Sequence, residues 1–472
     1  MNTNEITKTK FIEPVDVLFF RDAIPMQAGV GKGAGSRFPF PTTLHEAFRS
    51  SLLLSIGKTV SEKKIPGRPK EAVRKGNWHD EIEDSPVKIA AREFRSLCTV
   101  GPFPYLDGEG LFLPVPMDVT VEIPGKEGDD ENYNPKEENR NEDKKQKSKD
   151  SRDGLIVLHR MQLLWDKNCS FNRNGNSDAC LRCLPVSTRP PSKDAELKGY
   201  FSIEQYKKYL AGSNEPIQNA RKESEFWQPE YRIGIQIDPE TFSAKEGQIY
   251  AATYMRPVMT REKKLQFACQ LKLKDPRNGE KEALDKLNWL LFGGEHRLAR
   301  LYDARSKNPF EDNLFNPSED ELFKPLEKFK KDEPVLLKWV LVTPAIFAYG
   351  SIPGWCVENK GKNLPVGFVA LELKGKCCLI SWCLGRPVTF SGFDVVDWKA
   401  KDTLLGVPAG SVYYFLCENS DAAKELARKL HWKPRSDYYG EKGCGYGFVS
   451  FDVKMHPTSG SVLDLANQVF KQ

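Results

Sequence analysis

A short glycine-rich segment near the C-terminus, residues 438–448, constrains the fold more than any other part of the sequence. It reads Tyr-Tyr-Gly-Glu-Lys-Gly-Cys-Gly-Tyr-Gly-Phe, with four glycines within eight residues. Such a density does not belong in the interior of a helix or strand, because glycine loses more conformational entropy on ordering than any other residue. The segment therefore predicts a loop between a helical pattern over 421–430 and an apolar strand pattern over 448–453.

The same order of helix, glycine-rich cationic loop and strand occurs earlier in the chain. A helical pattern covers 281–292, Gly-Gly-Glu-His-Arg follows at 293–297, and a strand pattern covers 298–302. In each half of the chain, strand patterns precede the helix. That order is typical of βαββαβ units, in which helices cover one face of a sheet.

The expected fold class is therefore α+β, with two such domains. The first domain covers 1–305 and carries insertions, a linker follows over 306–334, and the second domain covers 335–472. Residues 122–154 contain almost no apolar side chain and mix both charge signs, so they cannot bury enough surface to offset their ordering entropy. We expect that insertion to be disordered, and the polar stretch 58–84 to be an excursion from the core.

A second glycine-rich loop lies near the N-terminus. An apolar strand pattern over 11–20 leads into alternate glycines over 29–35. Thr43 and Glu46 have the spacing of a capping box, which predicts a helix from Thr43 to about residue 56. Two hairpins are predicted, one over 97–119 and one from the strands 231–237 and 248–255. Further strand patterns cover 155–165, 265–273, 335–347, 367–373, 379–384 and 411–417, and a last helix covers 461–470.

Composition excludes several classes of protein. Hydrophobic residues make up 39% of the 472 residues and the net charge is +5, so a packed core can form and any nucleic-acid site must be a local patch. No apolar run approaches 18 residues, and residues 1–10 lack the apolar core of a signal peptide. We expect a cytoplasmic protein that makes no membrane contact.

The 11 cysteines are scattered along a long chain and are odd in number, which indicates reduced thiols rather than a disulfide framework. Cys180 and Cys183 have the two-residue spacing of a zinc knuckle, and Cys169 and His159 complete four ligands for a structural zinc. Since only one such cysteine pair is present, reduced structural thiols in a loop are the alternative. No other cofactor is expected.

Several short stretches occur in an order that is specific when they are taken together. They are an opening strand with an Arg-Asp turn at 14–22, a hairpin at 232–235 and 246–250, the Gly-Gly-Glu-His-Arg turn at 293–297, Thr-Pro-Ala-Ile-Phe at 343–347, and later strands at 391–394 and 407–413. With the C-terminal glycine-rich loop, these stretches resemble the RAMP superfamily of CRISPR RNA-binding proteins. Within it they are most similar to the subunits that cap the crRNA 5′ end in type III-B (Cmr) effector complexes.

This resemblance implies two ferredoxin-like (RRM-like) domains that face each other and hold RNA in a cleft between them. It also implies a scaffold in antiviral defence, with no catalysis of its own. Such a subunit holds the repeat-derived 5′ tag of the crRNA, caps the filament of RAMP backbone subunits and docks the large polymerase-like subunit. Target RNA would be contacted indirectly. The insertions at 122–154 and 169–183 lie outside the resemblance.

Single-stranded RNA is bound through cations and backbone N–H groups at its phosphates and through aromatic rings that stack on its bases. Candidates in the first half belong to the opening loop, the first helix and the Gly-Gly-Glu-His-Arg turn: Arg21, Gly31, Lys32, Gly33, Arg37, Thr43, His45, Arg49, Gly293, Gly294, His296 and Arg297. Candidates in the second half are Lys433, Arg435, Tyr438, Tyr439, Gly440, Lys442, Gly443, Gly445, Tyr446 and Gly447. The alternative for each is a solvated charge or an ordinary surface turn.

Two other functions stay open from the sequence. Some RAMP proteins cleave precursor crRNA with a histidine as general base, and His45, in the first turn of the first helix, is placed beside the glycine-rich loop for that role. A lone histidine in a helix is more often structural or a hydrogen-bond donor. The third function, a protein–protein adaptor, predicts no salt-dependent affinity for RNA.

Overall fold

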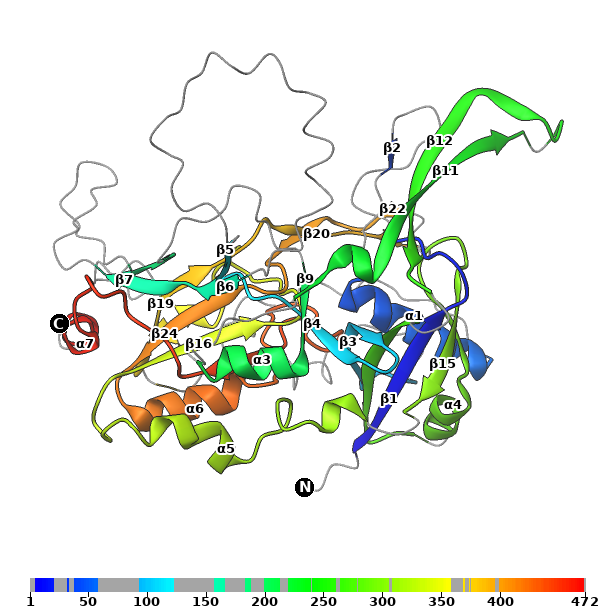
Figure 1. The fold of residues 1–472 in the computed structure, drawn as a ribbon. Coiled ribbons are helices and arrows are strands. Elements are labelled where there is room, and N and C mark those ends of the chain that lie inside the picture. The colour runs from blue at the N-terminus through cyan, green and yellow to red at the C-terminus, as the bar shows by residue number, and fades with distance from the viewer. Residues whose placement is uncertain are drawn as a thin grey trace, which may run out of the picture.

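The computed structural model describes residues 5–20, 32–33, 38–57, 93–122, 157–165, 183–187, 199–212, 220–238, 240–259, 264–277, 279–304, 308–357, 368–369, 373, 375–394 and 399–470. The predictions at 58–84 and 123–154 lie outside these residues. Sheets built mostly from antiparallel strands dominate the fold, and the helices are few and mostly short (Figure 1). Among the residues described, no helix is both long and apolar enough to cross a membrane.

The elements follow the chain from N- to C-terminus in two groups. Those of the first half are β1 (Glu5–Pro14), β2 (Lys32–Gly33), α1 (Pro41–Ser55), β3 (Leu97–Leu106), β4 (Gly110–Pro114), β5 (Val119–Glu122), β6 (Val157–Arg160), β7 (Gln162–Trp165), β8 (Cys183–Val186), β9 (Gly199–Ser202), α3 (Ile203–Leu210), β10 (Arg221–Lys222), β11 (Trp227–Ile237), β12 (Ala244–Pro257), β13 (Leu265–Lys274), α4 (Glu280–Lys286), β14 (Trp289–Leu291) and β15 (Leu298–Asp303). Those that follow are α5 (Glu319–Phe323), β16 (Val335–Leu341), β17 (Cys356–Val357), β18 (Phe368–Val369), β19 (Cys377–Cys383), β20 (Val388–Phe390), β21 (Phe393–Asp394), β22 (Lys399–Ala400), β23 (Leu404–Gly406), β24 (Val412–Cys417), α6 (Ser420–Leu430), β25 (Gly447–Ser450) and α7 (Val462–Phe470).

The sheet of the first half has eight strands in the order β10-β9-β4-β3-β13-β1-β15-β14. β1 is antiparallel to both β13 and β15, so that Phe11 stands opposite Ala268 on one side and Tyr302 on the other. β13 is in turn antiparallel to β3. In the chain, α1 lies between β1 and β3, and α4 lies between β13 and β15. Both helices contribute to one core with this sheet, in which Leu44 and Phe48 of α1 are fully buried.

Two helices differ from the sequence predictions at one end. α1 begins at Pro41, whose missing N–H suits the first position of a helix, so Thr43 lies within the first turn and the predicted capping box is absent. α4 ends at Lys286, earlier than predicted. The residues that follow form β14, in which Leu290 is buried between exposed Trp289 and Leu291. This alternation with a period of two belongs to a strand.

The sheet of the second half has six strands in the order β17-β18-β19-β24-β16-β25. β16 is antiparallel to both β24 and β25, and α6 lies between these two strands in the chain. Ala423 and Leu426 of α6 are fully buried in one core with Trp339 of β16 and Phe415 of β24. Among the residues described between β16 and β19, none is helical, so this half departs from the predicted βαββαβ order at its first connection.

The two sheets share one buried core. Phe103 of the first sheet and Val340 and Leu416 of the second belong to the same cluster. Phe315, from the predicted linker, lies in this cluster with its ring centroid 4.7 Å from that of Trp432. The facing surfaces therefore pack on each other around this cluster, which leaves no space there for the RNA cleft that the resemblance implied. A cavity of about 710 Å³, lined by residues of both halves, remains between them.

Candidate nucleic-acid interface

β11 and β12 form a long hairpin that projects from the body of the first half (Figure 1). The strands are antiparallel, and Ile235 stands opposite Ile249 in the outer part of the hairpin. β2, Lys32–Gly33 of the opening glycine-rich loop, joins the hairpin as a third strand, parallel to β12 at Ala251 and Ala252. One of the two predicted RNA-binding loops therefore comes to this hairpin.

The segment after β1 ties the base of the hairpin to the sheet. Leu18 exchanges two backbone hydrogen bonds with Met255 of β12, at 2.9 and 2.8 Å. The ring of Phe19 packs on that of Tyr254, with centroids 5.0 Å apart. Side chains on alternate positions of two segments thus form a small buried cluster that fixes where the hairpin leaves the body.

The Gly-Gly-Glu-His-Arg turn packs on the same segment. The N–H of Gly294 donates to the carbonyl of Phe19 at 2.7 Å. Gly293 has a φ of +97°, and a Cβ at this position would lie 2.5 Å from the same carbonyl oxygen. Only glycine allows both this conformation and this approach, so the two glycines position the turn against the chain rather than against a ligand.

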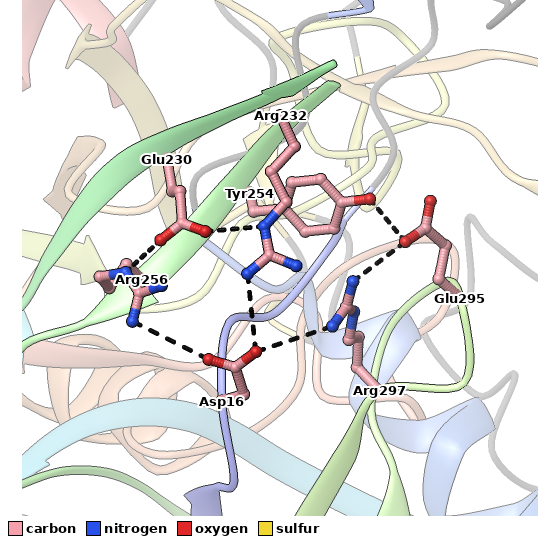
Figure 2. A network of polar contacts seen from close by, with 7 residues as sticks. All are labelled: Asp16, Glu230, Arg232, Tyr254, Arg256, Glu295 and Arg297. Atoms are coloured by element: carbon pink, nitrogen blue, oxygen red, sulfur yellow. Dashed lines mark hydrogen bonds and ion pairs between the residues drawn. The ribbon is translucent and has the colours of Figure 1, made fainter. Parts of the chain in front are cut away.

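Seven polar side chains meet where the hairpin joins the body (Figure 2), namely Asp16, Glu230, Arg232, Tyr254, Arg256, Glu295 and Arg297. The carboxylate of Glu230 accepts hydrogen bonds from Arg232, at 2.7 Å, and from Arg256. These two arginines hold the pKa of Glu230 below its ordinary value. The hydroxyl of Tyr254 donates to Glu295 at 2.5 Å. The cluster therefore joins three segments that are distant in the sequence.

Tyr254 orders two of the three arginines in this arginine cluster. The guanidinium groups of Arg232 and Arg297 each lie 4.9 Å from the centroid of its ring, within the range of a cation–π interaction. Burial, and then its hydrogen bond to Glu295, raises the pKa of Tyr254, so the hydroxyl stays neutral. A guanidinium that is already held in place loses less entropy when it binds an anion.

Asp16 lies among the three arginines without a close hydrogen bond to any of them. Its carboxylate is 3.6 Å from Arg232, 3.8 Å from Arg256 and 3.8 Å from Arg297, whereas an N–H···O hydrogen bond spans about 2.7–3.2 Å. All three arginines are partly exposed. Beyond the bonds that they make to Glu230 and Glu295, the three guanidinium groups have further N–H donors, and these can form charge-assisted bonds with phosphate oxygens.

The structure brings some of the predicted first-half residues to the arginine cluster and the hairpin. Gly293, Gly294, His296 and Arg297 form the turn within the cluster, and the backbones of Lys32 and Gly33 join the hairpin. Arg21, Gly31 and Arg37 lie outside the described residues.

The C-terminal glycine-rich loop packs against the first half instead of presenting open backbone groups. A Cβ at Gly443 would lie 2.8 Å from the carbonyl oxygen of Thr99 in β3. The N–H groups of Gly443 and Gly445 donate to the carbonyls of Gly440 and Pro344, both at 3.0 Å. The prediction that these N–H groups bind phosphate is therefore wrong, because they already have partners inside the protein.

The other predicted residues of the second half differ in how far they are buried and in their partners. Lys442 forms an ion pair with Glu46 of α1, across the contact between the two halves. Arg435 donates to the carbonyl of Lys429, and burial lowers its pKa to about 10. Gly440, Tyr446 and Gly447 are buried, Tyr438 and Tyr439 are half-buried, and Lys433 is exposed.

His45 and Arg49 of α1 are buried, with 5% and 7% of their surface exposed. The Nδ1 atom of His45 lies 3.4 Å from the hydroxyl of Thr99, and burial lowers the pKa of the imidazole to about 4. A buried imidazole does not reach the 2′-hydroxyl of an RNA on the surface. The predictions that His45 and Arg49 contact RNA are therefore wrong, and Thr43 beside them is half-buried.

The predicted zinc site is only partly within the described residues. Cys169 and Cys180 lie outside them, and His159 is described only by its backbone in β6. Cys183 is buried in the shared core, where burial raises the pKa of its thiol to about 12. In the part of the chain that the structure describes, no three metal-binding side chains come together. The zinc site therefore stays a prediction.

Sequence reasoning did not select Asp16, Arg232, Tyr254 or Arg256 as site residues. A signal was present, because charged or aromatic side chains occupy alternate positions on both strands of the hairpin. Their meeting depends on the register, which places Glu230 opposite Tyr254. That register cannot be read from either strand alone.

The fold and the site define an α+β protein. It has two packed antiparallel sheets and an arginine cluster at the base of a projecting hairpin. Residues 11–450 match the sequence model of a family of CRISPR-associated proteins, Cas_Cmr3, and the chain belongs to that family. The predicted kinship with type III CRISPR (Cmr) subunits is therefore confirmed. No curated protein matches the chain.

Solved structures with a similar chain come from type III CRISPR assemblies. In a type III-B Cmr-beta bound to cognate target RNA and AMPPnP, a chain is 13% identical, with 90% of each chain covered and a TM-score of 0.40. In Cmr-beta bound to cognate target RNA, a chain is 14% identical, with 93% of this chain and 95% of that chain covered and a TM-score of 0.40. In a Csm3–Csm4 subcomplex of the type III-A interference complex, a chain is 12% identical, with 86% and 92% covered and a TM-score of 0.29.

Proposed function

We propose that the chain is the non-catalytic crRNA-binding subunit of a type III-B CRISPR effector in the cytoplasm, where it holds the repeat-derived 5′ tag in antiviral defence. In this role it docks the large polymerase-like subunit onto the filament of RAMP backbone subunits and contacts target RNA indirectly. Membership of the Cas_Cmr3 family over residues 11–450 supports the effector assignment.

The observation that carries the RNA contact is the arginine cluster at the hairpin base. Arg232 and Arg256 bond to Glu230, and Arg297 bonds to Glu295, but all three lie beyond hydrogen-bond distance of Asp16. Since a guanidinium has five N–H donors, each arginine keeps donors for a phosphate. β2 of the opening glycine-rich loop joins the same hairpin. An RNA strand that crosses this surface meets cations held by an aromatic ring and lies outside the packed core.

Within this proposal each half is a ferredoxin-like unit. The spatial strand orders β3-β13-β1-β15 and β19-β24-β16-β25 support it. Numbered by their order in the chain, both sets of four strands lie in the sheet as 2-3-1-4, which is the order of a βαββαβ unit. The first half also has a helix on each of the two connections, whereas the second has α6 alone among the residues described.

The rival endoribonuclease function loses the histidine on which it rested. His45 is buried at the contact of α1 with β3 and is neutral at physiological pH. The adaptor function differs from the proposal in one measurable respect, since it predicts no salt-dependent RNA affinity.

The affinity of the purified chain for a 5′-tag RNA, measured at several salt concentrations, tests the proposal. Arg232→Gln with Arg256→Gln removes two phosphate contacts, so the slope of log affinity against log salt falls by about 1.4 for a single strand. Arg428→Gln is the matched control, because Arg428 is an exposed arginine that pairs with Glu319 on another face. An unchanged slope in the double variant, with thermal unfolding like that of the parent, would contradict the proposal.

A further inference from the structure

The tyrosines that the sequence singled out do not provide an open stacking surface for RNA bases. Tyr446 is buried, and Tyr438 and Tyr439 are half-buried in the C-terminal loop. Tyr254 of the arginine cluster is only 5% exposed. Trp289 of β14, by contrast, has 48% of its surface exposed. Because an unpaired base stacks on an accessible aromatic ring, Trp289 meets this requirement.

Trp289 belongs to an exposed patch on one face of the eight-stranded sheet. β14 and β15 are antiparallel, and Trp289 stands opposite Arg300. Leu291 stands opposite Leu298, two residues away on each strand, so both pairs point to the same side. Val15, whose N–H donates to the carbonyl of Leu298 at 3.1 Å, extends the patch onto the segment after β1 and is 52% exposed. These five residues are called the tryptophan patch below.

Arg300 holds the indole of Trp289 in place. Its exposed guanidinium lies 5.3 Å from the centroid of the tryptophan ring, within the range of a cation–π interaction. The carboxylate of Glu13, which stands opposite Arg300 on β1, accepts instead from Nε2 of Gln266 at 3.3 Å. Unpaired bases stack on aromatic rings and on guanidinium planes alike, so the two side chains form one platform.

The tryptophan patch adjoins the arginine cluster. Asp16 and Arg297 of the cluster lie 3.8 Å apart, and each is next in the chain to a residue of the patch (Figure 2). Since a strand rises about 3.3 Å per residue, Arg300 lies about 10 Å from Arg297 along β15. A single strand with a phosphate at the cluster can therefore place one of its next bases at Trp289.

The size of the tryptophan patch favours a nucleotide over a protein as its occupant. On the same face, Phe11 stands opposite Tyr302 and is only 6% exposed, because it belongs to the core that the two halves share. The patch therefore ends where the second half covers the sheet. A stable protein interface uses about 20–30 residues on each side, far more than the patch contains.

We propose that Trp289 and Arg300 form the platform on which an unpaired base of the bound RNA stacks, beside the phosphate held by the arginine cluster. This inference rests on the proposed function and adds a second kind of contact to it. Every base has a π face, so the platform increases affinity without selecting a sequence. The indole carries no charge, so its removal leaves the salt dependence of binding unchanged.

The affinity of the purified chain for tag RNA, measured at several salt concentrations, tests the platform. Trp289→Ala should weaken binding by about tenfold with the parent's salt slope, because stacking is lost and no charge is removed. Trp289→Phe keeps a ring and should stay within about threefold of the parent. The matched control is Tyr231→Ala, because Tyr231 is 69% exposed but points to the opposite side of β11 from Arg232. The control should bind like the parent.

Stacking itself is measured with tag RNA that carries 2-aminopurine at one position at a time, because the fluorescence of this base falls when it stacks. At one position we expect quenching by the parent and by Trp289→Phe, but not by Trp289→Ala. Thermal unfolding of Trp289→Ala should resemble that of the parent, since the side chain lies on an exposed face of the sheet.

Three outcomes would overturn the platform, and they are distinguishable. If Trp289→Ala binds and quenches like the parent while Arg232→Gln with Arg256→Gln loses affinity, the platform is wrong and the proposed function stands. If the parent has no salt-dependent affinity for the RNA, both are wrong. If Trp289→Ala keeps its RNA affinity but the effector purified through an affinity tag on this chain loses a subunit, the tryptophan patch is a protein contact instead.

Discussion

At the scale of single residues, burial decides what the polar side chains of this chain do. His431 shows this, because its Nε2 lies 3.0 Å from the carbonyl of Leu314 while its Nδ1 accepts the N–H of Val449 at 3.3 Å. These two bonds require a neutral imidazole with its proton on Nε2. Burial accordingly lowers the pKa of His431 to about 4.

This environment makes stability depend on pH. Since the folded pKa lies below the ordinary value of about 6.5, the unfolded state binds the proton first as pH falls. The contribution of His431 is therefore complete above pH 6.5 and is lost as pH falls towards 4, at a cost of about 2–3 kcal/mol. Urea unfolding at pH 7 and pH 4.5 measures this loss, which His431→Gln should reduce and the control His456→Gln should not. An unchanged pH dependence in His431→Gln would contradict the assignment.

At the scale of elements, the sequence predicted the central strands of both large sheets and the two longest helices, because apolar periodicity follows burial directly. It did not predict β14, whose leucines fit a helix and a strand equally well until Leu290 is seen paired with Ala299. For the glycine-rich loops, too, the sequence predicted only part of what the structure shows. Glycine density predicted that the chain turns tightly, but not whether RNA or another part of the protein comes close to Gly443.

Gly443 tests that distinction directly. It has a φ of +94° and lies against Thr99, so Gly443→Ala adds backbone strain and a clash, and we expect about 2–4 kcal/mol of destabilisation. The matched control is Gly108→Ala, because Gly108 has a φ of +80° but a Cβ there has open space. The control should lose about 1 kcal/mol from strain alone. Equal losses in denaturant unfolding would show that the contact with β3 contributes nothing.

At the scale of the whole molecule, the two halves form one packed unit. Asp118 of the first half is buried 3.6 Å from Lys338 of β16, and it accepts the hydroxyl protons of Tyr209 at 2.6 Å and Tyr414 at 3.1 Å. A buried ion pair with this many partners fixes the alignment of the sheets. The sequence patterns identified two halves but could not show that their facing surfaces close on each other, because that depends on contacts distant in the chain. In the proposed function, RNA therefore binds outside this core.

The position of the RNA is tested most directly by photo-crosslinking in the assembled effector. A crRNA with 4-thiouridine in its 5′ tag is irradiated in the complex, and the cross-linked peptides are identified by mass spectrometry. We expect cross-links to peptides from the base of the β11–β12 hairpin and from the turn at residues 293–297. Cross-links confined to the C-terminal loop at 438–448, or to other subunits, would contradict the central claim that the arginine cluster holds the tag.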